Sequence, residues 1–391
     1  TIYHGEVTLK GVTDEMEVSF DNGATYGANK THTYTEKGEK TVLVRYKETS
    51  ENLAGDDLKI KISYNDFAGG TGSSDDPFLI ETYDELKAIS DYDYKAAYKL
   101  LEDITFPAAP VCDIIVFSGT LLGNGKKLIS PVIDYSDNNG INAYGGIFHT
   151  NGQDTVIRDL TVENAQITTA PSPMTHGILI NSAKELSNCK VSGKIVLSCI
   201  LSRSYSVGGL CGEIDDADSK ISGCSADVTI ELVGKETTGF YFGGLVGKVS
   251  ANCVIENSNA KISADNGSMV FMKGYAGGLV GAVEKATAVT IARSWAATSL
   301  TVSAMNCYAG GIIGLAPNTD ITDCYATGSI SVSGNYVNSQ ALCVAGGITA
   351  GVTQSIGAPS GSIANCYSAV DFNIQWNNSN VIVAGIICNA L

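Results

Sequence analysis

The sequence is organised around the phrase Phe242-Gly243-Gly244-Leu245-Val246-Gly247, copies of which return through most of its length. Aligned on the second glycine, the copies fall at residues 146, 177, 209, 244, 278, 311, 347 and 385, so that neighbouring copies are 31 to 38 residues apart. A spacing of this size is typical of repeat architectures, in which each repeat is one supersecondary unit.

A second phrase follows each glycine phrase and carries a cysteine or serine, as in Ile321-Thr322-Asp323-Cys324-Tyr325-Ala326. Runs between the phrases, such as Val228-Thr229-Ile230-Glu231-Leu232-Val233, alternate apolar and polar residues as β-strands do. No stretch after about residue 110 has a helical period with caps. We therefore predict about three short strands per repeat. Because one such unit cannot bury its apolar face alone, the repeats are expected to stack into a β-solenoid with equivalent positions roughly 4.8 Å apart.

The two phrases together resemble the GLUG motif repeats of bacterial surface proteins. The resemblance lies in the alternation of Gly-Gly-Leu-Val-Gly with Ile-x-Asn-Cys-Tyr-Ala-x-Gly, and it covers roughly residues 70–391. It implies an all-β chain that forms a right-handed parallel β-helix of the pectate-lyase-like class. The motif is specific for this architecture and says little about activity.

Residues 1–66 have a different pattern. Alternating strands are predicted at 6–10, 16–20, 41–46 and 58–64, with turns at Asp21-Asn22-Gly23 and Lys37-Gly38, enough for a compact sandwich of six or seven strands. The run from 18 to 47 resembles the Ig/fibronectin-III-like modules of Gram-positive surface proteins. That resemblance implies a small spacer or accessory domain.

Between this module and the repeats we expect a linker and a cap. Residues 67–77 are rich in Gly and Ser and predict a linker, in which Asp75 and Asp76 favour a turn over a calcium site. Residues 78–111 are expected to form a helical cap and the first coil, because Thr82 and Glu85 have the spacing of a capping box. The repeats then fill residues 112–391. The chain stops inside a repeat phrase, which we interpret as a truncated C-terminus.

Composition excludes several classes of partner. The net charge of −16, with 21 acidic and 11 basic side chains in residues 1–110, argues against nucleic acid, whose phosphates need a basic surface. The sequence has no apolar run of about 18 residues, so we do not expect this stretch of chain to insert into a membrane. We expect a monomer that is extracellular, either secreted or on a bacterial surface.

The eleven cysteines do not have the spacing of a disulfide or zinc framework. Four of them share one repeat position with two serines, which predicts a buried row of small side chains carrying free thiols. Disulfides between the neighbouring pairs Cys189/Cys224 and Cys324/Cys366 stay open, since stacking brings such positions close enough. The predicted row is Cys189, Cys224, Ser258, Ser294, Cys324 and Cys366.

Catalytic residues are not evident. None of the four histidines pairs with another at zinc-ligand spacing, and His149 and His176 adjoin glycine phrases, where we expect turn or surface positions. The densest acidic run is Asp215-Asp216-Ala217-Asp218, near Lys220 and Arg203, and an acidic turn explains it better than a sugar-cleaving site. Arg158-Asp159 and the pair Asp134/Asp137 are weaker candidates. We predict no catalytic, cofactor-binding or metal residues; calcium is left open.

Aromatic side chains are the better candidates for binding. They can form rows that contact a sugar or a protein, or they can fill the corners of the coils, which we favour for the tyrosines beside glycine. The two groups are Tyr205, Tyr241, Tyr275, Tyr308 and Tyr336 beside the glycines, and Trp295, Tyr325 and Tyr367 in the cysteine phrase.

The expected function is that of a non-catalytic, adhesin-like scaffold that presents an elongated β-helix to a glycan or a protein. Two alternatives remain. The pectate-lyase-like class includes polysaccharide lyases and glycoside hydrolases, and GLUG repeats also accompany catalytic domains, which implies an accessory region of a large secreted protease.

Overall fold

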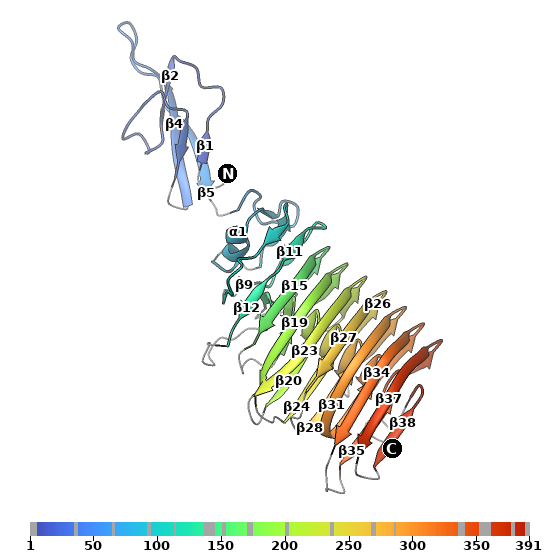
Figure 1. Cartoon of the computed structure of the whole chain (residues 1–391). Helices are drawn as coiled ribbons and strands as arrows, with labels where there is room; N and C mark the ends of the chain where they lie inside the picture. Colours follow the sequence, from blue (N-terminus) through green and yellow to red (C-terminus); the bar gives the residue numbers. More distant parts are fainter. Residues whose placement is uncertain are drawn as a thin grey trace.

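The computed structural model of the chain describes residues 6–34, 38–64, 67–91, 95–112, 115–136, 145–150, 154–169, 175–199, 203–234, 238–266, 271–284, 287–334, 341–351, 361–376 and 380–387. A small β module forms the N-terminal part, and a long solenoid of parallel strands forms the rest (Figure 1). Within the described ranges, no helix has the length and apolarity needed to cross a bilayer.

The N-terminal module has its own small core. In the part that is described, β1 (Glu6–Thr8) pairs with β3 (Thr31–Thr33), and β2 (Met16–Ser19), β4 (Gly38–Tyr46) and β5 (Leu58–Tyr64) form a second antiparallel sheet. Val18, Val42 and Ile62 are buried between them. The described ranges of the module contain five strands, and the runs 20–30 and 47–57 form turns and loops, so the count of six or seven strands stays a prediction. The Ig/fibronectin-III-like topology stays a prediction.

The solenoid has four faces, which we call sheets 1 to 4 in the order in which each coil visits them. Sheets 2 and 3 are joined into one sixteen-stranded sheet, because β31 (Trp295–Gly310) runs through both. Sheet 1 contains β6 (Phe78–Ile80), β7 (Ala97–Leu100), β10 (Thr120–Leu122), β14 (Val156–Arg158), β18 (Glu185–Ser187), β22 (Ser219–Ser222), β26 (Cys253–Glu256), β30 (Val289–Ala292), β33 (Thr319–Thr322) and β36 (Ile363–Ala364).

The other three faces are built in the same way. Sheet 2 contains β8 (Ile104–Thr105), β11 (Lys127–Ile129), β12 (Val132–Asp134), β15 (Thr161–Thr168), β19 (Lys190–Cys199), β23 (Ser225–Gly234), β27 (Asn259–Asp265), β31, β34 (Tyr325–Gly334) and β37 (Tyr367–Trp376). Sheet 3 contains β16 (Thr175–Gly177), β20 (Ser204–Gly208), β24 (Gly239–Gly243), β28 (Phe271–Gly277), β31, β35 (Leu342–Gly346) and β38 (Val381–Ala384). Sheet 4 contains β9 (Ile115–Val116), β13 (Phe148–His149), β17 (Ile180–Ser182), β21 (Cys211–Ile214), β25 (Val246–Val249), β29 (Val280–Val283) and β32 (Ile313–Leu315).

The strands of sheets 1 to 4 pair in parallel, and in the described residues they stay in register except for a shift between Val162 and Ala165 of β15, which confirms the predicted stacking of equivalent positions. A typical coil has four strands and not three: β22, β23, β24 and β25 run through sheets 1 to 4. The difference arises inside the glycine phrase itself, because Gly243 ends the sheet 3 strand and Val246 begins the sheet 4 strand.

Lack of space explains the glycines of the phrase. A Cβ on Gly243 would lie 1.9 Å from the carbonyl oxygen of Val246, across the turn between sheets 3 and 4. A Cβ on Gly244 would lie 2.2 Å from the carbonyl oxygen of Gly278 in the next coil. A Cβ on Gly247 would lie 2.4 Å from the Val207 nitrogen, so this glycine lets sheet 4 fold back against sheet 3 of the preceding coil.

The corner between sheets 1 and 2 uses a second device. From β14 onward, each described corner of this kind places one residue in the left-handed region, with φ between 49° and 65°. Asparagine tolerates this conformation well, and its amide can bond the preceding coil, as Asn188 Nδ2 does to Asp159 Oδ1 at 2.9 Å. The residues at this corner are Asp159, Asn188, Gly223, Asn257, Arg293, Asp323 and Asn365.

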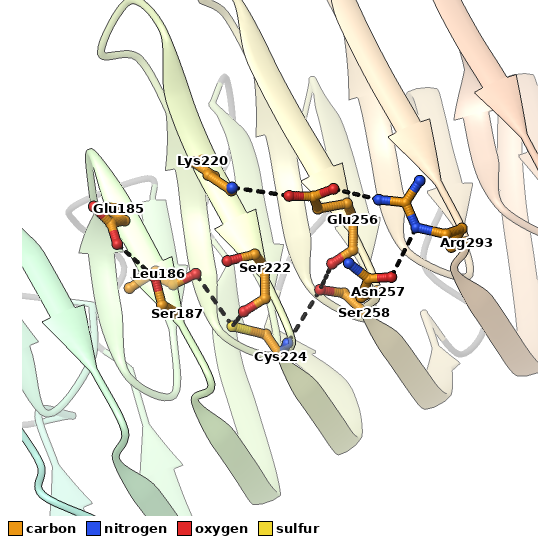
Figure 2. Close-up of polar contacts among 10 residues, drawn as sticks. All are labelled: Glu185, Leu186, Ser187, Lys220, Ser222, Cys224, Glu256, Asn257, Ser258 and Arg293. Carbon is orange, nitrogen blue, oxygen red and sulfur yellow. Dashed lines mark hydrogen bonds and ion pairs between the residues drawn. The ribbon is translucent and has the colours of Figure 1, made fainter.

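The residue after this corner belongs to the predicted cysteine and serine row. The backbone nitrogen of Cys224 donates to Ser258 Oγ at 3.1 Å (Figure 2). The backbone nitrogen of Ser258 in turn donates to Ser294 Oγ at 3.1 Å, so the row passes from coil to coil. Cys189, Cys224 and Cys324 are buried and Cys366 is half-buried, and all four are free thiols. Contact with the Cys224 thiol, together with burial, raises the pKa of Cys189.

The N-terminal end of the solenoid is closed as expected by a short helix, α1 (Tyr83–Ala88), followed by the turn η1 (Ile89–Asp91). The capping box is present: Glu85 N donates to Thr82 Oγ1 at 3.3 Å, and Thr82 N donates to Glu85 Oε2 at 2.9 Å. Leu86 and Ile89 are fully buried in the solenoid core.

The segment 67–77 is not a free linker. Phe67 is fully buried and stacks on Phe78 of β6 at 4.7 Å, and Ala68 N donates to the Leu79 carbonyl at 2.9 Å. The glycine-rich composition reflects tight turns against the first coil, since Ala97 N also bonds the Gly72 carbonyl.

Candidate functional site

Three tyrosines on neighbouring coils form a stacked row on the outer face of sheet 3. Tyr241, Tyr275 and Tyr308 are in register, with ring centroids 4.9 and 5.2 Å apart and interplanar angles of 3° and 9°. Strand alternation produces this outward position, because Phe240 and Phe242 on either side of Tyr241 point into the core. We call these three residues the tyrosine ladder.

The tyrosine ladder faces sheet 4 across the fold in the glycine phrase. Tyr275 packs with Ala282 and Leu315 of sheet 4, and Tyr241 and Tyr308 extend this contact to either side. Beside the ladder lies a hollow of about 700 Å³, which we call the trough. Its lining combines Tyr241 and Tyr275 with sheet 4 and with the connections that lead from sheet 4 to sheet 1.

The ladder hydroxyls are available to a ligand. None of the three hydroxyls bonds another residue in the described part of the chain, although Tyr275 is only 8% exposed. Burial raises the pKa of Tyr241 and of Tyr308, and burial together with its two tyrosine neighbours raises that of Tyr275, so all three stay neutral at physiological pH. Neutral phenols can both donate and accept hydrogen bonds.

The charged residues of the trough form a bridge. Lys248 Nζ lies 2.9 Å from Glu213 Oε1 and 2.9 Å from Glu284 Oε1, which come from the two neighbouring coils. Burial alone would lower the pKa of Lys248, but its hydrogen bonds to Glu284 and Glu213 outweigh burial and raise it. The lysine therefore stays protonated and is not a general base at neutral pH.

Sheet 4 gives the trough a polar and an apolar end. Along the in-register row, Glu213 and Lys248 are followed by Ala282 and then Leu315. Stacking covers both ring faces of Tyr275 and one face each of Tyr241 and Tyr308, so a ligand in the trough meets mainly ring edges and hydroxyls. This arrangement suits binding of a polyhydroxylated molecule with some apolar surface.

The acidic run 215–218 is a structural turn. Asp215 Oδ1 accepts a hydrogen bond from Ser182 Oγ, and Asp216 Oδ2 accepts one from the Asp154 nitrogen at 3.1 Å. Burial raises the pKa of Asp216. Lys220 does not join the aspartates but binds Glu256 Oε1 at 2.8 Å, in a chain of ion pairs that continues to Arg293 (Figure 2).

The remaining charged candidates are also engaged locally. Arg158 forms a bidentate pair with Glu185 at 2.8 Å, and Asp159 is a corner residue. Asp134 Oδ1 accepts from the Ser136 nitrogen at 2.9 Å, while Asp137 lies outside the described residues. Arg203 precedes β20, whereas the aspartates follow β21.

The predicted calcium turn and the histidines behave differently. The carbonyl of Asp76 accepts from the Thr71 and Gly72 nitrogens at 3.0 Å, so this segment is a backbone-bonded turn. His149 and His176 are buried strand residues, not turn or surface residues. His176 is in register with the core residue Val207, whereas His149 follows the core residue Phe148 at the end of β13. Among the described residues no group of three or more His, Cys, Asp or Glu side chains has a metal-binding arrangement.

The other predicted aromatics divide between core and surface. Tyr205 is fully buried and stacks near His176, as expected for a corner filler, and Tyr336 lies outside the described residues. Trp295, Tyr325 and Tyr367 form a separate in-register row on the outer face of sheet 2, where Tyr325 is 42% and Tyr367 61% exposed. The sequence analysis did not predict Glu213, Lys248 and Glu284 as site residues. The one sequence signal for them is their spacing from the last glycine of the glycine phrase, which they follow by one residue or, for Glu284, by three.

Comparisons with known proteins agree with this architecture. Residues 203–231 and 305–331 match the family model of the GLUG motif, so the motif corresponds to a coil path through sheets 3, 4, 1 and 2. The chain is thus a parallel β-solenoid that carries GLUG motifs. A crystal structure from Bacteroides ovatus, titled "a putative immunoglobulin A1 protease", is similar with a TM-score of 0.52 and 17% identity, over 78% of this chain and 86% of that one.

Two further similarities are more limited. A protein of Evansella cellulosilytica named "Putative Gly-rich membrane protein" is 30% identical over 124 residues, which is 29% of this chain. The matched stretch spans only 14% of the length of that relative. A structure titled "IgA1 Protease" is similar with a TM-score of 0.40 and 14% identity, over 94% of this chain and 29% of that one.

Proposed function

We propose that the chain is a non-catalytic, elongated module of a bacterial surface or secreted protein, and that it binds a glycan in the trough. The observation that carries this proposal is the tyrosine ladder, which lines a hollow of about 700 Å³ with hydroxyls that no described residue bonds. None of these hydroxyl oxygens is among the described buried atoms that lack a partner, so they reach solvent and can bond a ligand. The name of the Evansella relative and the fold shared with the Bacteroides structure support a place at or outside the cell surface.

The chemistry of the trough supports binding over cleavage. A lyase needs an unprotonated base, and Lys248 is held as an ammonium by two carboxylates. A hydrolase needs a carboxylic acid free to deliver its proton, and Glu213 and Glu284 are both engaged with Lys248. The charged side chains therefore bind one another, and the hydroxyl and amide groups of the trough stay available to bond a ligand.

Glycan arrays with matched variants test the proposal. Tyr241→Phe/Tyr275→Phe/Tyr308→Phe removes only the ladder hydroxyls, each expected to contribute about 0.5–1.5 kcal/mol. Binding of the glycan that the wild-type chain selects should then weaken by at least about tenfold. Tyr325→Phe/Tyr367→Phe, on the exposed face of sheet 2, should leave binding unchanged. An array without any retained glycan, or equal losses in the two variants, would contradict the proposal.

A second candidate is an accessory region of a secreted protease. The observation in its favour is the fold shared with the Bacteroides ovatus structure, whose title names such an enzyme. Under this alternative the solenoid holds a catalytic domain away from the cell and needs no ligand of its own. Removal of the tyrosine ladder hydroxyls would then leave every activity of the full-length protein intact.

A further inference from the structure

A second hollow adjoins the trough around a corner of the solenoid. It measures about 360 Å³ and lies over sheet 1, where Lys220, Val254 and Thr290 are among its lining residues. Asn252 lines both the trough and the second hollow. The two hollows therefore meet at the connection between β25 of sheet 4 and β26 of sheet 1.

The lengths of the connections explain the meeting point. The connection 250–252 has three residues, whereas those of the coils on either side, 215–218 and 284–288, have four and five. Ala217 and Asp218 line the hollows on one side of this short connection, and Glu284 and Thr287 do so on the other. A chain molecule that leaves the trough over Asn252 can thus enter the second hollow.

The junction itself offers a hydrogen-bond donor. Asn252 Oδ1 accepts from the Ala288 nitrogen at 3.0 Å, which fixes the amide, and its Nδ2 group bonds no described residue. Amides in this role commonly bond sugar hydroxyls or acetamido oxygens, because they present donors and an acceptor in one plane.

The charges select among extended ligands. In the trough, Lys248 is bound by two carboxylates, Glu284 of the lining and Glu213 beside it, which leaves a local excess of negative charge. In the second hollow, Asp218 and Asp320 outnumber Lys220. Both parts therefore repel acidic polysaccharides. A common way to bind an extended peptide is to add it as a strand to an open sheet edge. The strands under both hollows have none, since β25 and β26 are paired on both sides.

We propose that the trough and the second hollow form one continuous site for a neutral, unbranched oligosaccharide that bends over Asn252 from sheet 4 to sheet 1. The ligand follows the path of a single coil and not the long axis of the solenoid. This inference rests on glycan binding in the trough and adds the class of the glycan and its route.

A length series tests the route. The probes are β-1,4-linked glucose and N-acetylglucosamine oligomers from disaccharide to hexasaccharide, with an oligolysine peptide as the basic alternative, each measured by calorimetry. The hexasaccharide of the selected sugar should bind the wild-type chain at least about tenfold more tightly than the disaccharide. Val254→Trp, which fills the second hollow from a 40% exposed position, should abolish this gain and leave the disaccharide unaffected. Val233→Trp, at a 45% exposed position on β23, is the matched control and should preserve the gain.

The outcomes separate the two proposals. Binding without a gain from length, or an equal loss of disaccharide and hexasaccharide in Val254→Trp, would overturn the continuous site while sparing glycan binding. Binding of none of the sugars, or of oligolysine alone, would overturn the neutral-glycan assignment. Thermal midpoints of the two tryptophan variants within a few degrees of the wild-type chain show that the fold is kept.

Discussion

Alanine at Gly244 should destabilise the solenoid far more than alanine at the equivalent glycine of the last copy, Gly385. At Gly244 the new Cβ would lie 2.2 Å from the Gly278 carbonyl oxygen and 2.4 Å from the Ala260 Cβ. Both neighbours belong to the next coil, and the first is fixed backbone that accepts the Gly244 nitrogen at 3.2 Å. At Gly385 nothing lies within 4 Å of the added atom.

The magnitude follows from these contacts. Overpacking typically costs 1–3 kcal/mol, and loss of the strained hydrogen bond adds about 1 kcal/mol. A restricted unfolded chain returns about 0.4–1 kcal/mol. Gly244→Ala should therefore lower the free energy of unfolding by about 2–3 kcal/mol, while Gly385→Ala should leave it unchanged or raise it slightly.

Urea unfolding followed by tryptophan fluorescence measures this difference. The two tryptophans, Trp295 and Trp376, both lie in the solenoid, so the signal does not include the N-terminal module. A loss below about 0.5 kcal/mol for Gly244→Ala, or a loss of equal size for Gly385→Ala, would refute the idea that contact between coils dictates the glycines.

Four shorter predictions concern other parts of the chain. Asn257→Ala should lower the free energy of unfolding by about 1–2 kcal/mol, because residue 257 has a left-handed backbone, and Asn257→Gly should lower it by less in the same urea experiment. The reverse order would contradict the corner geometry. Thr82→Ala should lower the free energy of unfolding by about 1 kcal/mol, and Thr82→Ser should restore it. An unchanged free energy of unfolding in Thr82→Ala would show that the capping box does not stabilise the fold. Cys112 is exposed and should react rapidly with a thiol reagent in the folded state, while the buried cysteines, such as Cys253 with a pKa raised by burial to about 12, should wait for unfolding; equally fast reaction of all thiols would argue against the core. Folding raises the pKa values of the three ladder tyrosines, so the stability that their burial contributes is fully present below pH 10.0 and is lost as the pH rises above that value. The triple phenylalanine variant should therefore lose less stability in that pH range than the wild-type chain. A loss equal to that of the wild-type chain would count against burial of the ladder.

The parts of the fold that repeat in sequence were predictable. The shared position of Cys224 and Ser258 indicated a stacked interior row, and the structure places both in it. The helical cap was also predictable from the sequence, because a capping box depends only on two residues at a fixed spacing, here Thr82 and Glu85. Local and repeated signals need no knowledge of distant contacts.

The prediction of three strands per repeat was wrong for a steric reason. The alternating pattern predicted about three strands per repeat, whereas Gly243 ends one strand and Val246 begins another that folds back on it. The segment 67–77 failed in a similar way: its glycines suggested freedom, yet Phe67 anchors it in the core.

The candidate site was only partly predictable. All five tyrosines near glycine seemed equivalent, but Tyr205 lies three residues before its first glycine and Tyr241 only two. One residue of offset turns a side chain to the other face of a strand, so Tyr205 is in the core and Tyr241 in the trough. Lys248 and its two carboxylates come from three coils, and no local pattern joins them.

The most direct test of glycan binding in the trough is a crystal structure of the chain with the hexasaccharide that it binds most tightly. The account predicts sugar rings beside the edges of Tyr241 and Tyr275, with the chain passing over Asn252 toward Val254. Sugar bound instead on the outer face of sheet 2, against Tyr325 and Tyr367, would contradict it.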